Sequence, residues 1–362
     1  MNERRWNFVT RQLSRCRRFL AILPSLASSP HALAAASRQL GRAGFFHGFE
    51  GLKEVLRAME GNLANADALR LAARGANRSG YLIYAPPYTA NSAGIWCLYR
   101  LCHELNERGF PSFMVNSYRT APQCVAPLIG WSEARRLVRR GYTAVYPEVV
   151  VGNPLRARSV ARWVLNRPGL LGGHRAYDAS ELVFNYSEVY KAYIRGPIAG
   201  MLHMPTIDQS IFFCDNDDLS HRSLECFYVG KSAWKDGVVQ RSKAFEITRL
   251  TPPKSELGKL FRASRVLYCF DNSTILVFEA LMCGCPVVII PDGTQTKADY
   301  ANLELGMEGI AWGPEELGQV QTNVPRLRSR YEAIKDEFQV QLTQFIAITQ
   351  HAVDSTAVRA AA

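Results

Sequence analysis

The chain has 362 residues, of which 48% are apolar and 21% charged, and its formal net charge at pH 7 is +11. This length exceeds what one hydrophobic core usually serves, and the composition excludes a largely disordered chain, so two domains with an appendage are expected. No run of the sequence reaches the roughly 20 apolar residues that a membrane-spanning helix needs.

The positive charge is concentrated at the N-terminal end. Residues 1–78 carry 13 Lys/Arg and five Asp/Glu, a net charge of +8. Within them, residues 1–24 predict a basic amphipathic helix that either lies on an anionic membrane surface or docks on the protein itself. A signal peptide is the less favoured alternative, because Pro24 cuts the apolar stretch short. Nine cysteines, several in apolar surroundings, favour a cytoplasmic protein with reduced thiols, at the inner membrane face if the helix binds lipid.

Beyond residue 80 the pattern changes to short apolar runs that alternate with amphipathic helices. Strands are expected at 81–84, 112–115, 143–146, 163–165 and 182–184, and again at 226–229, 245–248, 266–270 and 287–290. A first helix is expected from about Ile95 to Gly109, a glycine that suits a helix C-terminus. Further helices are expected near 254–264 and 274–284. This alternation predicts an α/β fold with two Rossmann-like, doubly wound domains and an N-terminal helical extension.

The expected boundaries follow from these patterns. They are a basic helical extension over 1–78, a first domain over 79–204, a second domain over 205–324, and a C-terminal helix over 325–362. The segment 201–212 is the expected hinge. The C-terminal helix has one apolar stripe that must be buried on a domain and that can bridge both: Leu327, Tyr331, Ile334, Phe338, Leu342 and Phe345.

The strongest motif begins where the strand 266–270 ends. It begins with Asp271-Asn-Ser-Thr and ends with Glu279-Ala-Leu-Met-Cys-Gly284-Cys-Pro286-Val-Val. At roughly 3.6 residues per turn, Glu279 lies about one and a half turns into the helix that follows the strand. Free N–H groups at a helix start, together with the hydroxyls of Ser273 and Thr274, favour an anion. The structural alternative is that Asp271 caps the helix and Glu279 is a solvated helix residue.

Asp271-x₇-Glu279, with the Gly-Cys-Pro-Val-Val ending, resembles the acidic-x₇-Glu signature of the retaining "group 1" glycosyltransferases of the GT-B fold. The resemblance implies that Glu279 holds the ribose of a nucleotide-sugar donor and that Asp271 contacts the transferred sugar. The run Tyr228-Val-Gly-Lys231 to Lys235 resembles the family's basic pair, which neutralises the donor diphosphate without a metal or other cofactor.

Weaker candidates come from strand ends and loops. Ser92 and Gly94 lie in a loop before the first helix and suit phosphate, Glu148 follows a first-domain strand and suits the acceptor, and Arg249 follows a second-domain strand. A structural carboxylate is the alternative for Glu148. The predicted catalytic residues are Asp271, Glu279 and Lys235, and the predicted donor-binding residues are Lys231, Lys235, Arg249, Asn272, Ser273, Thr274, Glu279, Gly94 and Ser92.

The function expected from the resemblance is sugar transfer from a nucleotide-diphosphate donor to a glycan or lipid-linked acceptor. Retention of configuration, metal independence and a place in cell-surface polysaccharide or lipopolysaccharide synthesis belong to the same expectation. Two rivals remain open: a GT-B-shaped epimerase acting on the nucleotide sugar alone, and a non-catalytic protein whose basic end holds nucleic acid. Nucleic acid is not expected as a partner, since the basic end lacks a known recognition module.

Overall fold

The computed structural model of the protein describes residues 79–361, apart from 90–91, 118, 122, 216–220, 231, 249–252, 273, 294 and 321. The predicted extension over 1–78, with its amphipathic helix at 1–24, therefore lies outside the described residues.

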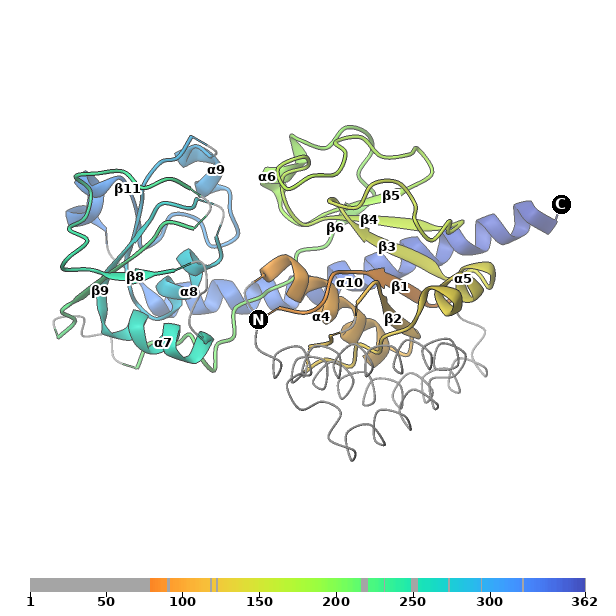
Figure 1. The fold of residues 1–362 in the computed structure, drawn as a ribbon, viewed down its shortest axis with the longest axis horizontal. Helices are drawn as coiled ribbons and strands as arrows, with labels where there is room; N and C mark the ends of the chain where they lie inside the picture. Colours follow the sequence, from red (N-terminus) through yellow and green to blue (C-terminus); the bar gives the residue numbers. More distant parts are fainter. Residues whose placement is uncertain are drawn as a thin grey trace, which may run out of the picture.

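The N-terminal domain is built on a six-stranded, fully parallel sheet in the order β2-β1-β3-β4-β5-β6 (Figure 1). Its strands are β1 (Tyr81–Tyr84), β2 (Ser112–Val115), β3 (Thr143–Pro147), β4 (Val160–Val164), β5 (Leu182–Asn185) and β6 (Gly200–Met201), and its helices are α4 (Ala93–Glu107), α5 (Trp131–Arg139) and α6 (Glu188–Lys191). The first three strands are apolar and almost completely buried, as expected of strands covered on both faces.

The C-terminal domain has a five-stranded parallel sheet in the order β11-β10-β9-β7-β8. Its elements are β7 (Leu224–Tyr228), β8 (Phe245–Ile247), α7 (Lys254–Ala263), β9 (Ser264–Cys269), α8 (Leu276–Met282), β10 (Val287–Ile289), α9 (Lys297–Ala301), β11 (Ile310–Trp312) and the 3-10 helix η1 (Pro314–Gln319). Two parallel α/β sheets confirm the predicted pair of Rossmann-like domains. The predicted boundary at 204/205 falls in the connection between β6 and β7.

Helices cover the two sheets unequally. In the N-terminal domain, α4 packs on one face and α5 on the other. In the C-terminal domain, α7 and α8 pack on one face, whereas the other face is covered by η1 and by a segment without an α-helix that carries Trp234, Val238 and Val239. Trp234 stacks on Phe270 with the ring centroids 4.9 Å apart, so the Trp234 side chain helps to bury this face of the sheet.

The long helix α10 (Val324–Ala361) joins both domains (Figure 1). Leu327 and Tyr331 belong to the core of the C-terminal domain, and Phe338, Leu342 and Phe345 belong to the core of the N-terminal domain. The predicted stripe is thus buried on both domains. The Tyr331 hydroxyl also contacts the backbone N and O of Ile207 in the connecting segment, at 2.7 and 3.0 Å.

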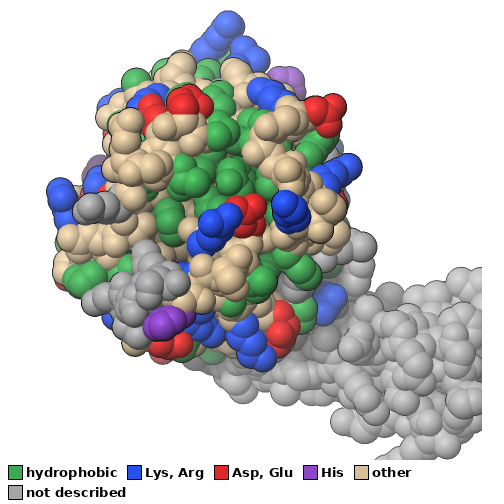
Figure 2. All heavy atoms as spheres, turned by 90° about the vertical axis from the view of Figure 1, so that its left-hand side faces the viewer, with side chains coloured by type: hydrophobic (Ala, Val, Ile, Leu, Met, Phe, Trp, Pro, Cys, Tyr) green, Lys and Arg blue, Asp and Glu red, His purple; other side chains and the backbone are tan. Residues whose placement is uncertain are grey.

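The outer end of the C-terminal domain shows hydrophobic side chains bordered by basic and acidic ones, without a stripe of a single sign of charge (Figure 2). In the part of the chain that the structure describes, no helix combines the length and the apolar character needed to cross a membrane.

Candidate functional site between the two sheets

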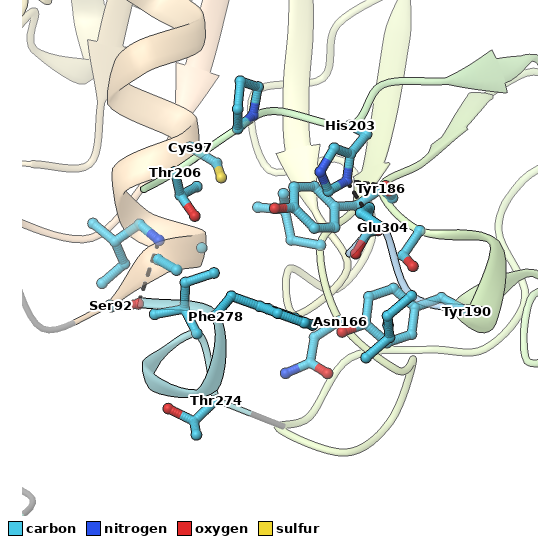
Figure 3. Close-up of a pocket in the computed structure, with 18 of the residues that line it drawn as sticks. Ser92, Cys97, Asn166, Tyr186, Tyr190, His203, Thr206, Thr274, Phe278 and Glu304 are labelled. Atoms are coloured by element: carbon cyan, nitrogen blue, oxygen red, sulfur yellow. Dashed lines mark hydrogen bonds and ion pairs between the residues drawn. The ribbon is translucent and has the colours of Figure 1, made fainter. Parts of the chain in front are cut away.

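The two sheets present equivalent edges to one cavity. In parallel sheets ordered 2-1-3, ligands bind at the carboxyl ends of the strands, where the connections diverge to opposite faces. In the N-terminal sheet this point lies between β1 and β3, and in the C-terminal sheet between β7 and β9. A cavity of about 470 Å³ lies between these two points and is lined by residues of both domains (Figure 3). We call it the interdomain cavity.

On the C-terminal side, the cavity is lined by Asp271 and Asn272, which directly follow β9 and Phe270. Asp271 lies against Gly230 in the turn after β7. Gly230 has a φ of +58°, and a Cβ added to it would be 2.4 Å from the Asp271 Oδ2. Only glycine combines that backbone conformation with that proximity. The sequence therefore fixes Asp271 at the switch point of the sheet.

Asn272 is 1% exposed, and neither its Oδ1 nor its Nδ2 has a hydrogen-bond partner among the residues that the structure describes. An amide buried without partners costs about 1–3 kcal/mol. Because Asn272 also lines the interdomain cavity, a ligand with donors and acceptors offers the missing partners. Of its neighbours in the motif, Thr274 lines the cavity and Ser273 lies outside the described residues.

Glu279 lies one layer behind the cavity. Its side chain is fully buried, and its Oε1 forms an ion pair with the Lys254 ammonium at the start of α7. Burial raises the pKa of Glu279, and the charge of Lys254 opposes that shift. Within the described ranges, the Oε2 of Glu279 has no hydrogen-bond partner. Sequence reasoning missed Lys254, which is 25 positions from Glu279 and carries no local signal of the pairing.

The predicted diphosphate-binding side chains are only partly described. Lys231 and Arg249 lie outside the described residues. Lys235 is exposed, is not among the residues that line the interdomain cavity, and donates a hydrogen bond to the carbonyl oxygen of Pro291. Close by, the Ser232 hydroxyl donates to Asp292 over 2.7 Å. The turn after β7 is therefore attached to the loop after β10.

On the N-terminal side, the start of α4 and the end of β3 line the cavity. Ser92 is the N-cap of α4, and its hydroxyl accepts a hydrogen bond from the Ile95 N–H over 3.3 Å (Figure 3). Gly94 leaves space, since the nearest atom to an added Cβ would be 4.0 Å away. The two residues are thus brought to the cavity, with the Ser92 hydroxyl engaged in capping.

Glu148 immediately follows β3 and is 4% exposed where it lines the cavity. Its Oε2 accepts a hydrogen bond of 3.0 Å from the Leu165 N–H. Burial raises the pKa of Glu148 to about 7, and the hydrogen bond and the nearby Arg162 only partly oppose that shift. Such a carboxyl group exchanges a proton near neutral pH.

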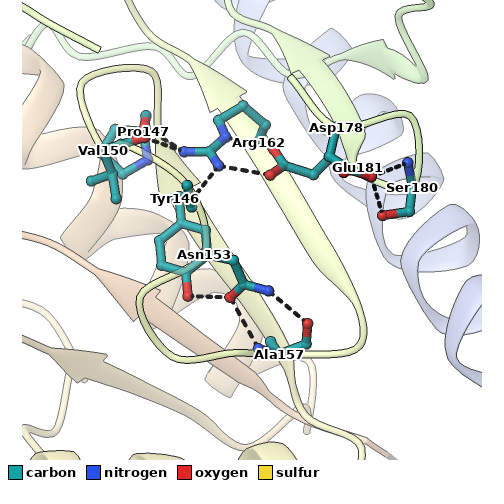
Figure 4. Close-up of polar contacts among 10 residues, drawn as sticks. Tyr146, Pro147, Val150, Asn153, Ala157, Arg162, Asp178, Ser180 and Glu181 are labelled. Carbon is teal, nitrogen blue, oxygen red and sulfur yellow. Dashed lines mark hydrogen bonds and ion pairs between the residues drawn. The ribbon is translucent and has the colours of Figure 1, made fainter. Parts of the chain in front are cut away.

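The loop that carries Glu148 is held in place by hydrogen bonds from Arg162 (Figure 4). Arg162 on β4 donates to the carbonyl oxygens of Val150 and Gly152 over 2.6 and 2.9 Å, and pairs with Glu181 over 2.8 Å. Gly173 packs on the same loop, because an added Cβ would lie 2.0 Å from the Glu148 carbonyl oxygen. Gly173, in the glycine-rich segment 169–173 that lacks a nucleotide-binding spacing, therefore has a packing role.

A histidine and a carboxylate join the domains across the cavity, and sequence reasoning missed them. The His203 Nδ1, just after β6, lies 3.1 Å from the Glu304 Oε1 after α9 (Figure 3). Burial alone would raise the pKa of Glu304, but the hydrogen bond and charge of His203 outweigh it and lower the pKa. The Tyr186 ring packs on His203 with centroids 4.5 Å apart.

No protein-family model and no curated protein matches the chain. Among solved structures, that of WaaG, a glycosyltransferase involved in lipopolysaccharide biosynthesis, aligns with 74% of this chain and 99% of its own, at 11% identity and a TM-score of 0.46. The glycotransferase of kitacinnamycin aligns with 76% of this chain and 99% of its own, at 11% identity and a TM-score of 0.34. At this level of likeness the two structures establish no common family.

Proposed function

We propose that this chain is a glycosyltransferase, which moves a sugar from a nucleotide-diphosphate donor to a hydroxyl group of a glycan or lipid-linked acceptor. The observation that carries the proposal is Asn272, a buried amide without a partner in the described part of the chain, beside Asp271 at the switch point of the C-terminal sheet. Sugar hydroxyls both donate and accept hydrogen bonds, so they suit the two unpaired amide atoms and the neighbouring carboxylate.

In this proposal the donor lies on the C-terminal domain. The sugar contacts Asp271 and Asn272. The motif resemblance implies that Glu279 holds the ribose, which requires the donor to reach its Oε2 behind the cavity wall. Lys231 and Lys235 stabilise the departing diphosphate, because fixed ammonium groups can take the place of a metal ion at developing negative charge. For this role Lys235 has to leave the Pro291 carbonyl oxygen and turn toward the donor.

The acceptor lies on the N-terminal side, near Glu148, whereas Ser92 and Gly94 at the start of α4 face the donor phosphates across the cavity. The cavity volume of about 470 Å³ is within the range of small-ligand sites, and its enclosure between two domains limits the access of water to the donor. The motif resemblance implies retention of configuration, and the stereochemistry of the product tests retention against inversion.

The biological setting belongs to the same proposal. We place the enzyme in cell-surface polysaccharide or lipopolysaccharide synthesis on the cytoplasmic side, with residues 1–24 as a contact to anionic lipid. The described cysteines are all free, which supports a reducing compartment.

A thermal-shift screen with UDP, GDP, ADP, CMP and TDP tests the donor site. A nucleotide at 100 times its dissociation constant adds about 2.7 kcal/mol to the free energy of unfolding. We expect one nucleotide to stabilise the protein, and Asn272→Ala to reduce the effect of the matching nucleotide sugar. Asn166→Ala is the matched control, because Asn166 lines the same cavity from the N-terminal domain.

Two results would contradict the proposal. One is that no nucleotide or nucleotide sugar raises the melting temperature. The other is that the full-length protein converts a nucleotide sugar to its epimer when no acceptor is present, which identifies the rival epimerase.

A further inference from the structure

Three acidic side chains line the interdomain cavity among the residues that the structure describes: Glu148, Asp271 and Glu304. Asp271 lies on the donor side, and Glu304 is engaged with His203. Glu148 is the acidic side chain that comes from the N-terminal domain, and the proposed function puts the acceptor on this side of the cavity. A proton acceptor for the incoming hydroxyl has to be on that side.

The Glu148 carboxylate is held in place without a cation of its own. The Leu165 N–H fixes its Oε2, and no ion pair of Glu148 occurs within the described part of the chain. The basic group whose charge acts on Glu148 is Arg162, whose guanidinium pairs with Glu181 through Nε and Nη2 at 2.8 and 3.0 Å. Its charge is therefore already compensated.

Among the described residues, the electrostatic effect of Glu148 reaches two tyrosines, Tyr177 between β4 and β5 and Tyr190 in α6. Burial raises the pKa of Tyr177 to about 12 and that of Tyr190 above its ordinary value, so both stay neutral near pH 7. With a pKa of about 7, Glu148 is the group in this cluster that changes charge in the physiological range.

From this geometry we infer that Glu148 is the general base of the transfer and that the reaction inverts the anomeric configuration. The inference rests on the proposed function. The carboxylate takes the proton of the acceptor hydroxyl, the acceptor oxygen bonds to the anomeric carbon, and the bond from that carbon to the diphosphate oxygen breaks with its electron pair. The products are the glycoside, the nucleoside diphosphate and a protonated Glu148, which then releases its proton to solvent.

The stereochemical consequence follows from the group that takes the proton. When a protein carboxylate takes it, the leaving phosphate does not have to lie on the same face as the acceptor hydroxyl, and the reaction is a direct displacement from the opposite face. Such a displacement inverts the anomeric carbon. In the retaining route the leaving phosphate takes the proton on the same face, and Glu148 has no proton to accept.

The test uses the full-length protein, the nucleotide sugar that stabilises it most, and methanol as the acceptor. The configuration of the methyl glycoside is read by proton NMR, and we expect inversion. In Glu148→Gln the side chain keeps its size and an oxygen for the Leu165 N–H. We expect kcat to fall by about 10²–10⁴-fold, with the nucleotide-induced thermal shift unchanged.

Glu188→Gln serves as the control, because Glu188 is exposed in α6 and pairs only with Lys191 among the described residues. A glycoside of retained configuration, or a Glu148→Gln variant with full turnover, overturns the role of Glu148 and leaves the proposed function standing. A wild-type protein that binds the nucleotide sugar but forms no glycoside overturns the proposed function, and the inference with it.

Discussion

The Arg162 guanidinium and the Glu181 carboxylate form a buried, two-pronged ion pair in the N-terminal domain, with side-chain exposures of 1% and 7% (Figure 4). The same guanidinium donates to the backbone of the loop that carries Glu148. Arg162 thus positions the loop, while Glu181 compensates the charge that would otherwise favour the ionised form of Glu148.

Glu181→Gln should therefore lower the pKa of Glu148. Without the Glu181 carboxylate, the charge of Arg162 acts on Glu148 uncompensated and favours its ionised form. We expect the acidic limb of the kcat/KM profile to move to lower pH. Loss of one partner of a buried pair also costs about 3–5 kcal/mol of stability, so urea unfolding is measured alongside.

Asp178→Asn is the control for this shift, because Asp178 is a nearby acid that is fully exposed and bonds to Ser180. An acidic limb that stays in place or moves to higher pH in Glu181→Gln would show that Arg162 does not act on Glu148.

The raised pKa of Glu148 also predicts how stability depends on pH. The group titrates at about 7 in the folded protein and at 4.5 in its ordinary state, so the folded protein binds the proton more tightly. Its stabilising contribution is complete below pH 4.5 and is lost as the pH rises through 7. The difference amounts to roughly 3 kcal/mol. Wild type should therefore lose more stability than Glu148→Gln between pH 5 and pH 8, as measured by urea denaturation. Equal losses in both proteins would contradict the assignment.

Most of the fold could be predicted from the sequence, because buried parallel strands are apolar runs and helix ends carry their own signals. The stripe on α10 predicted that this face is buried on a domain and can bridge both, and Leu327 and Phe345 indeed lie in the cores of the two domains. Helix α5 was not predicted, because only three of its residues are buried and they sit among arginines. The fourth strand was predicted at 163–165 but begins at Val160, since Arg162 interrupts the apolar run and is buried only through its partners.

The candidate site could be predicted only where a residue follows a strand. Asp271 and Glu148 were found because parallel strands bring their carboxyl ends to one edge. Three ion pairs could not be predicted, because the tertiary fold brings their partners together and no regular spacing in the sequence relates them. They are Lys254–Glu279, Arg162–Glu181 and His203–Glu304. The chain position of Glu279 likewise could not show that Lys254 covers it.

Gly230→Ala tests the contact between the turn after β7 and Asp271. An added methyl group would overlap the Asp271 carboxylate and the Tyr228 ring at 2.4 and 2.5 Å, in a backbone conformation that disfavours any side chain. Gly237→Ala is the matched control in the same segment, with a φ of +81° and no atom within 4 Å of the added group. We expect Gly237→Ala to cost about 1–2 kcal/mol and Gly230→Ala about 1–3 kcal/mol more.

The same pair should differ in donor binding. Gly230→Ala displaces Asp271 and should abolish the thermal shift caused by the nucleotide sugar, whereas Gly237→Ala should keep it. If both variants bind the donor as the wild type does, Asp271 is not part of the donor site.

A double-mutant cycle on Lys254 and Glu279 separates structure from function at the second acid of the motif. Lys254→Met leaves the fully buried Glu279 without its cation and should cost about 3 kcal/mol, the lower end for buried pairs because Lys254 is itself partly exposed. Glu279→Gln should cost less, since the ammonium group can turn to water. The double variant should be more stable than the sum of the two single losses predicts, because no unpaired charge remains. Additive losses, measured by urea unfolding, would mean that the two side chains do not interact in solution.

Nucleotide binding by Glu279→Gln gives a second readout. If this variant has near-native stability but shows no thermal shift with the nucleotide, the Glu279 carboxylate binds the ribose. If the thermal shift is unchanged, the carboxylate serves the fold alone.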